Sequence, residues 1–83
     1  MKFKAEINVM PHDALLDPQG KAVTGSLKNI GLEAIQNVRI GKHISIEIEA
    51  IDEAQANQIV TDACKKLLAN MIMEKFDFTL TKV

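Results

Sequence analysis

Apolar and polar residues alternate in two stretches of the chain, and each alternation predicts a half-buried β-strand. In residues 2–10 every second residue is apolar: Phe3, Ala5, Ile7 and Val9. In residues 75–81 the apolar positions are Phe76, Phe78 and Leu80. Successive side chains of a strand point to opposite faces, so these residues share one face of their strand. We expect that face to lie against the core, and Pro11, which lacks a backbone donor, to end the first strand.

A different spacing, with apolar residues three and four positions apart, predicts a helix between Asp17 and Gly31. Its apolar positions are Ala22, Val23, Leu27 and Ile30. The Asp17 carboxylate can accept a free backbone N–H, and the fixed φ of Pro18 suits the first helical position. Gly31 can adopt at low cost the left-handed conformation that ends a helix. Gly20 and Gly25 each weaken the helix by about 1 kcal/mol, so we expect tertiary contacts to hold it.

A β-hairpin is predicted around Gly41, because residues with high strand propensity lie on both sides of it. They are Val38 and Ile40 before the glycine, and Ile44, Ile46 and Ile48 after it. A two-residue loop would place apolar residues opposite polar ones, so the pattern disfavours it. A three-residue loop over residues 41–43, or an equivalent bulge, keeps the apolar residues on one face. The expected pairs are Ile40 with Ile44 and Val38 with Ile46.

The second helix is predicted to begin at Asp52, with Gln55 three residues later as a variant of the capping box. Its apolar positions are Ala56, Ile59, Val60, Ala63, Cys64, Leu67 and Leu68. Asn70 suits the position just after the helix. With the strand at 75–81, the element order is βαββαβ. This order predicts an α+β fold, a ferredoxin-like βαββαβ sandwich in which an antiparallel sheet carries two helices on one face.

The composition limits the core and the kinds of partner. The 83 residues suit a single domain, residues 1–83, with 47% hydrophobic but only 4% aromatic residues. So small an aliphatic core favours self-association. The 10 basic and 11 acidic residues nearly cancel, which disfavours nucleic acid or an acidic membrane as partner. One cysteine forms no internal disulfide and no apolar run reaches about 18 residues, so we expect a cytoplasmic protein.

Few residues suggest chemistry. Cys64 falls within the apolar stripe of the second helix, where burial raises a thiol pKa, so we expect a core thiol and not a nucleophile. His12 and His43 lie in different predicted connections without acidic residues at metal-ligand spacing. We therefore predict no catalytic residue and no metal site in this chain.

Gly20 and Gly25 have the G-x-x-x-x-G spacing of a phosphate loop, but Ser26 stands where the lysine should be and the motif lies inside a predicted helix. The helix-start motif could bind an anion through free N–H groups, but capping by its aspartate already accounts for it. That motif comprises Asp17, Pro18, Gln19 and Gly20. RNA binding is disfavoured too, because the open sheet face is expected to be polar and without aromatic residues.

Three blocks of the sequence, LDPQG at 16–20, VRIGK at 38–42 and CKKLLAN at 64–70, resemble the PurS subunit of phosphoribosylformylglycinamidine synthase. The resemblance spans essentially the whole chain, and the blocks occur in the same order. The chain departs from the family in the loop PHDALL at 11–16, which is more acidic than expected, and at Met71, where proline often follows asparagine. We expect the loop geometry to differ at these two places.

The resemblance implies an accessory role in de novo purine biosynthesis. PurS-like chains join a glutaminase subunit to a large ATP-using synthetase subunit, and the complex makes formylglycinamidine ribonucleotide from formylglycinamide ribonucleotide, glutamine and ATP. This chain would be a homodimer, with a tetramer as a further option, and would help ammonia to pass between the catalytic subunits. It would carry no cofactor, since ATP and magnesium are used by the synthetase subunit.

Within that role, the candidate partner-binding residues are Arg39, Gly41, Lys42 and Gly25. We expect Arg39 on the exposed sheet face and Lys42 in the turn, both without a folding task. Arginine suits bidentate recognition of carboxylate or phosphate, and Gly41 would let a partner's backbone approach closely. Gly25 leaves a notch on the outer face of the first helix. An alternative hypothesis is a ferredoxin-like small-molecule-sensing regulatory module, although no residue indicates an effector.

Overall fold

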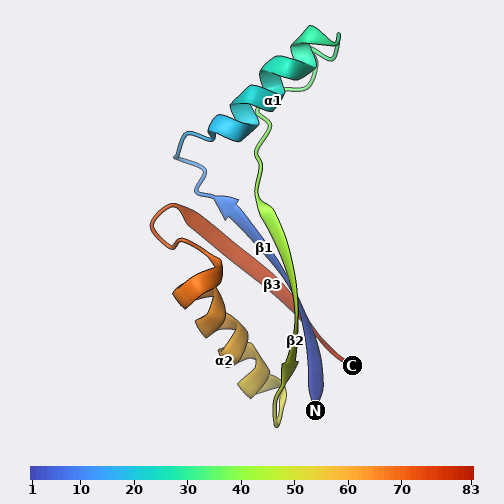
Figure 1. Ribbon diagram of the computed structural model, residues 1–83, viewed down its shortest axis with the longest axis vertical. Coiled ribbons are helices and arrows are strands. Elements are labelled where there is room, and N and C mark those ends of the chain that lie inside the picture. Colours follow the sequence, from blue (N-terminus) through green and yellow to red (C-terminus); the bar gives the residue numbers. More distant parts are fainter.

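The computed structural model describes residues 1–83 as three strands and two helices (Figure 1). In chain order the elements are β1 (Lys2–Pro11), α1 (Pro18–Asn29), β2 (Lys42–Glu49), α2 (Glu53–Ala63), the π-helical turn η1 (Cys64–Leu68) and β3 (Glu74–Lys82). The molecule is elongated, with extents of 51 × 26 × 14 Å and a radius of gyration of 16.4 Å. A compact chain of this length has a radius of gyration of about 12 Å. Part of the chain therefore stands away from the core.

The sheet is antiparallel with the order β2-β1-β3, so β1 is the central strand. Its alternating apolar residues are buried, as predicted, and the two in the middle, Ala5 and Ile7, have apolar partners on both sides. Ile7, for example, lies between Ile44 of β2 and Phe78 of β3, and none of its surface is exposed. The α+β class with an antiparallel sheet is confirmed.

Helix α2 covers the apolar face of this sheet and completes the core. Asp52 caps it by accepting the Gln55 N–H at 2.8 Å, while the Gln55 amide oxygen accepts the Ile51 N–H at 2.8 Å. Ala56, Val60 and Cys64 are fully buried against the sheet. The predicted start of this helix is confirmed. Its predicted apolar stripe is confirmed only in part, since Ile59 is 39% and Leu67 83% exposed, and α-helical periodicity ends at Ala63, where η1 takes over. Neither helix of the chain combines the length and the apolar character needed to span a bilayer.

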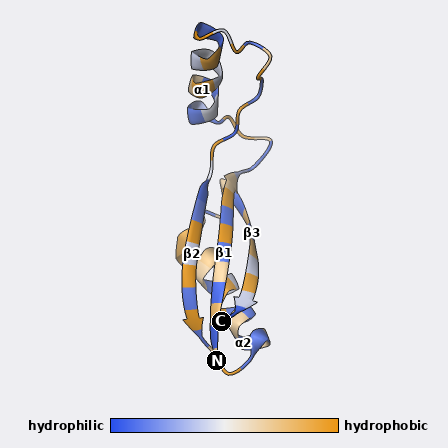
Figure 2. Cartoon of the chain, turned by 90° about the vertical axis from the view of Figure 1, so that its right-hand side faces the viewer, coloured by the Kyte–Doolittle hydropathy of each residue, from blue (hydrophilic) through white to orange (hydrophobic).

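Helix α1 has the predicted ends but not the predicted place. Asp17 caps its start, and Gly31 just beyond it has a positive φ of 84°. The helix lies beyond the end of the sheet and packs on neither of its faces (Figures 1 and 2). Its apolar stripe is open, with Val23 39% and Ile30 69% exposed. The prediction that both helices cover one sheet face is therefore wrong for α1 within the chain.

The predicted hairpin around Gly41 is also wrong. Residues 32–41 form no regular element, and β2 begins only at Lys42 and pairs with β1. We call residues 36–41 the return segment, since they lead from α1 back to the sheet. The Val38 N–H is bonded to Thr24 and the Ile40 N–H to Asp17, both on α1 or its cap. The predicted strand residues are thus tied to the helix, and the order within the chain is βαβαβ instead of βαββαβ.

Candidate functional site

The distinctive part of the molecule is the junction between the sheet and α1, which we call the neck: residues 12–20 and the return segment. Asp17 is its central residue. One carboxylate oxygen accepts the Gly20 N–H at 3.1 Å and caps α1, and the other accepts the Ile40 N–H at 2.8 Å. The bond from Ile40, followed by that from Gly20, lowers the Asp17 pKa. A single carboxylate therefore fixes the return segment to the helix start.

Gly20 allows these two segments to come together. A Cβ atom at this position would overlap the carbonyl oxygen of Val38. One turn later, the Thr24 hydroxyl donates to the Gly20 carbonyl at 2.8 Å and accepts the Val38 N–H at 3.2 Å. The block LDPQG is thus explained by structure: aspartate, proline and glycine start α1 and hold the return segment against it.

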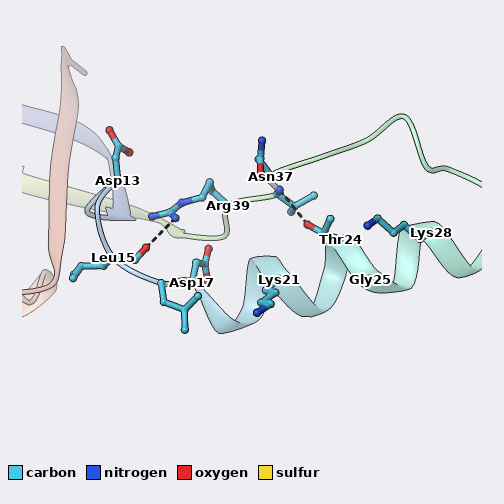
Figure 3. A pocket seen from close by; sticks show the side chains of 11 residues that line it. Asp13, Leu15, Asp17, Lys21, Thr24, Gly25, Lys28, Asn37 and Arg39 are labelled. Atoms are coloured by element: carbon cyan, nitrogen blue, oxygen red, sulfur yellow. Dashed lines mark hydrogen bonds between the residues drawn. The ribbon is translucent and has the colours of Figure 1, made fainter.

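Arg39 ties the other side of the neck. Its guanidinium donates to the His12 carbonyl at 2.8 Å and to the Leu15 carbonyl at 3.1 Å, the second bond being drawn in Figure 3. The expectation that Arg39 lies on the exposed sheet face without a folding task is wrong, because the segment that carries it never joins the sheet. Its cation instead holds the loop after β1 against the return segment.

The other three candidate residues differ in their surroundings. Gly41 is packed against its own chain, since a Cβ there would overlap the Val9 carbonyl oxygen, so its small size is needed within the fold. Lys42 was expected in a turn, but it is the first residue of β2, where it is exposed and pairs across the sheet with Val9. Gly25 has open space where a side chain would lie, as predicted.

A groove of about 750 Å³ runs along the neck and α1 (Figure 3). Its lining comes from the loop after β1, from α1 and from the return segment. It includes Asp13, Asp17, Lys21, Gly25, Lys28 and Arg39. Lys21 and Lys28 stand on either side of Gly25 along the helix and form no ion pair within the chain. Such a surface suits binding of another chain or ligand.

A second polar cluster lies on the open face of the sheet. The two ring nitrogens of His43 lie 2.7 Å from the Asn8 amide oxygen and 2.6 Å from a Glu6 carboxylate oxygen. Asn8 in turn donates to Asp77 at 3.0 Å. The histidine, more than the other neighbours, lowers the Glu6 pKa. Sequence reasoning placed His43 in a loop and missed this cluster, although the alternation of β1 already put Glu6 and Asn8 on one face.

Cys64, the first residue of η1, is fully buried in the core, and this burial raises its thiol pKa. The prediction of a core thiol is confirmed. A cysteine nucleophile needs the opposite surroundings, which expose the thiol and lower its pKa.

Comparison with known proteins decides the family. Residues 4–82 match the family model PurS, described as phosphoribosylformylglycinamidine (FGAM) synthase. The chain belongs to the PurS family. A PurS subunit of phosphoribosylformylglycinamidine synthase from Synechocystis sp. is 39% identical over 79 residues, which cover 95% of this chain and 79% of that relative. The resemblance in the three sequence blocks is thus confirmed across the chain, and the hypothesis of a sensing module is not favoured.

Solved PurS structures have the same chain path. The Bacillus subtilis PurS structure aligns with a TM-score of 0.89 at 32% identity, covering 96% of this chain and 99% of that one. A chain in the structure of PurLQS from Thermotoga maritima aligns with a TM-score of 0.88 at 30% identity, covering 96% and 98%. The projecting α1 is therefore compatible with the PurS fold, which is of the ferredoxin-like type.

Proposed function

We propose that this chain is a non-catalytic PurS subunit that joins a glutaminase subunit to an ATP-using synthetase subunit. The observation that carries the proposal is the projection of α1, whose apolar stripe and adjoining groove lie open along an elongated molecule. A helix with an uncovered apolar face needs a partner to bury it. The Thermotoga maritima structure is that of PurLQS, which supports assembly with two other kinds of subunit.

The proposed division of labour follows from the surfaces. This chain supplies contacts, while the glutaminase releases ammonia and the synthetase uses ATP and magnesium. Holding the two catalytic subunits together keeps ammonia near its acceptor, because proximity raises its effective concentration. The burial of Cys64 supports a role without covalent chemistry. The cytoplasm is the compartment in which we propose that it works.

We also propose that the chain acts as a homodimer. Only 12 of its 83 residues are buried, and ten of these form the core cluster. Small domains with so little core usually gain stability by associating. Of the candidate partner-binding residues, Lys42 and Gly25 have open surroundings that a partner could occupy, whereas Arg39 and Gly41 are engaged within the neck.

Reconstitution with the two larger subunits tests the adaptor role. We expect glutamine-dependent synthesis to require this chain and ammonia-dependent synthesis by the synthetase to require it much less. Ile30→Asp places a charge on the apolar stripe of α1 and should abolish assembly, whereas Leu67→Asp, at a residue 83% exposed beyond α2, is the matched control. Full glutamine-dependent synthesis without the chain, or with Ile30→Asp, would refute the proposal.

A further inference from the structure

The open face of the sheet, which no helix covers (Figure 2), carries side-chain bonds that link all three strands. The ring nitrogens of His43 on β2 lie 2.6 Å from a Glu6 carboxylate oxygen and 2.7 Å from the Asn8 amide oxygen, both on β1. The Asn8 amide nitrogen donates to Asp77 of β3 at 3.0 Å. Asn8 is the register partner of both His43 and Asp77, so these bonds run straight across the sheet.

Asp77 fixes which way the Asn8 amide points. An ionised carboxylate has no proton to donate, so the Asn8 group that lies 3.0 Å from it must be the NH2 group. With the amide turned over, two oxygens would meet at this distance without a proton between them. The Asn8 oxygen therefore faces His43. Because an amide oxygen only accepts hydrogen bonds, the ring nitrogen beside it, Nδ1, must carry a proton.

Glu6 requires a proton on the other ring nitrogen. Its second carboxylate oxygen accepts the Ser45 hydroxyl at 3.0 Å and lies 3.3 Å from the Lys4 ammonium. The hydrogen bond from His43, followed by that from Ser45, lowers the Glu6 pKa, so this group is an ionised carboxylate that only accepts. Nε2 of His43 must therefore donate as well. A neutral imidazole has one N–H and an imidazolium has two, so this geometry belongs to the charged ring.

The other charged groups on this face favour the same state of the ring. Two carboxylates face it, Glu6 directly from β1 and Asp77 from β3 through the asparagine. The lysines that strand alternation places on this face are all paired: Lys2 with Glu47, Lys4 with Glu6 and Lys75 with Asp13. Asp77 has no lysine partner, so its negative charge favours a cation on the ring.

We propose that His43 is a proton-dependent link between the strands of the sheet. With a proton on each nitrogen, the ring bonds β2 to two residues of β1, and through Asn8 to β3. When one proton leaves to solvent, one of the two bonds loses its hydrogen and two acceptors face each other. Histidine ordinarily changes charge between about pH 5 and 8, so this loss falls in the physiological range. His43 is the second residue of β2, so the link secures the end of that strand nearest the neck. It lies within one chain and is independent of the adaptor role.

Nitrogen NMR of the ring tests the charged state. The chain has two histidines, so His12→Gln leaves His43 as the only source of ring signals. We expect the imidazolium, with a proton on each nitrogen, to predominate at pH 7.0, where a free histidine is about one-quarter protonated. Glu6→Gln in the same background should return the ring to about that fraction. Glu47→Gln, which removes a carboxylate of the same face away from the ring, is the matched control and should not. A ring that is mainly neutral at pH 7.0 in the folded His12→Gln chain would refute the proposal.

The pH dependence of stability tests the link itself. Because the bonds need the second proton, their contribution is fully present below about pH 6 and is lost as pH rises. His43→Gln should raise the unfolding equilibrium constant about threefold at pH 5.5 and leave it nearly unchanged at pH 8.5. His12→Gln, at a histidine that bonds only through its main chain, should have the same effect at both pH values. Urea unfolding measures both variants. A His43→Gln effect that is equal at the two pH values, or larger at pH 8.5, would overturn the link.

Discussion

The two ends of this molecule contain apolar residues at similar helical spacing, yet only one end buries them. In the sheet and α2, the side chains of Ile7, Val60 and Cys64 are completely covered. In α1 the corresponding stripe is open, and the helix is positioned by polar contacts to main-chain groups and by glycine. The sheet end is therefore held by burial of apolar side chains. The α1 end is held by a few specific hydrogen bonds and by the close approach at a glycine.

The largest expected effect comes from truncating the same residue type at the two ends. Ile7→Ala should lower the free energy of unfolding by about 2–5 kcal/mol, because Ile7 is fully buried and its loss leaves a cavity. Ile30→Ala, at a residue 69% exposed, should change the stability of the dissociated chain by no more than about 0.5 kcal/mol. Urea unfolding over a range of protein concentrations separates these effects from changes in association. Equal costs at both sites would show that α1 packs within its own chain.

A pair of glycine substitutions compares two positions on α1. Gly20→Ala should cost about 1–3 kcal/mol, because the added methyl group overlaps the Val38 carbonyl and forces the return segment away. Gly25→Ala, which meets open space, should stabilise the chain by about 0.5–1 kcal/mol through helix propensity alone. Thermal unfolding measures both, and X-ray scattering shows whether α1 has moved. A stabilising Gly20→Ala would exclude the close approach.

The sheet end could be predicted from the sequence because its determinants are local. Alternation in β1 and β3 and the cap at Asp52 each act within a few residues, and all were found in the structure. The ends of α1 were predictable for the same reason. Cross-strand contacts required knowing which strands are neighbours, which is why the cluster around His43 was missed.

The neck was not predictable because its hydrogen bonds join residues that are far apart in the sequence, and because its residues also fit a strand pattern. Val38 and Ile40 have strand propensity, and nothing in the neighbouring sequence reveals that Thr24 and Asp17 accept their N–H groups. Arg39 was expected to be free because its acceptors are two carbonyls of the loop after β1, which no side-chain pattern reveals. Gly41 was expected to let a partner's backbone approach, but it is the Val9 carbonyl of its own chain that lies where a side chain would be.

The next effect in size is a pH dependence of stability that comes from Asp17 in the neck. The Asp17 pKa is lowered in the folded chain, so its ionised form favours folding. This contribution is fully present above the ordinary pKa of about 4 and is lost as pH falls through the lower folded value. The stability difference between wild type and Asp17→Asn should be constant from about pH 7 to 5 and shrink below about pH 4.

Taking the difference in stability between the two proteins cancels the contributions of the other carboxylates with lowered pKa values, which are Glu6, Asp13 and Glu47. Urea unfolding at several pH values gives the difference directly. If Asp17→Asn and the wild type lose stability in parallel down to pH 3, the carboxylate is not what fixes the return segment.

The smallest effects concern the two cations of VRIGK. Arg39→Ala should cost about 1 kcal/mol, since it removes two bonds to carbonyls from a half-exposed guanidinium. Lys42→Ala should change the stability of the chain by less than about 0.5 kcal/mol. Urea unfolding of both variants beside the wild type measures these changes. A cost for Lys42→Ala as large as that for Arg39→Ala would show that Lys42 also has a folding task.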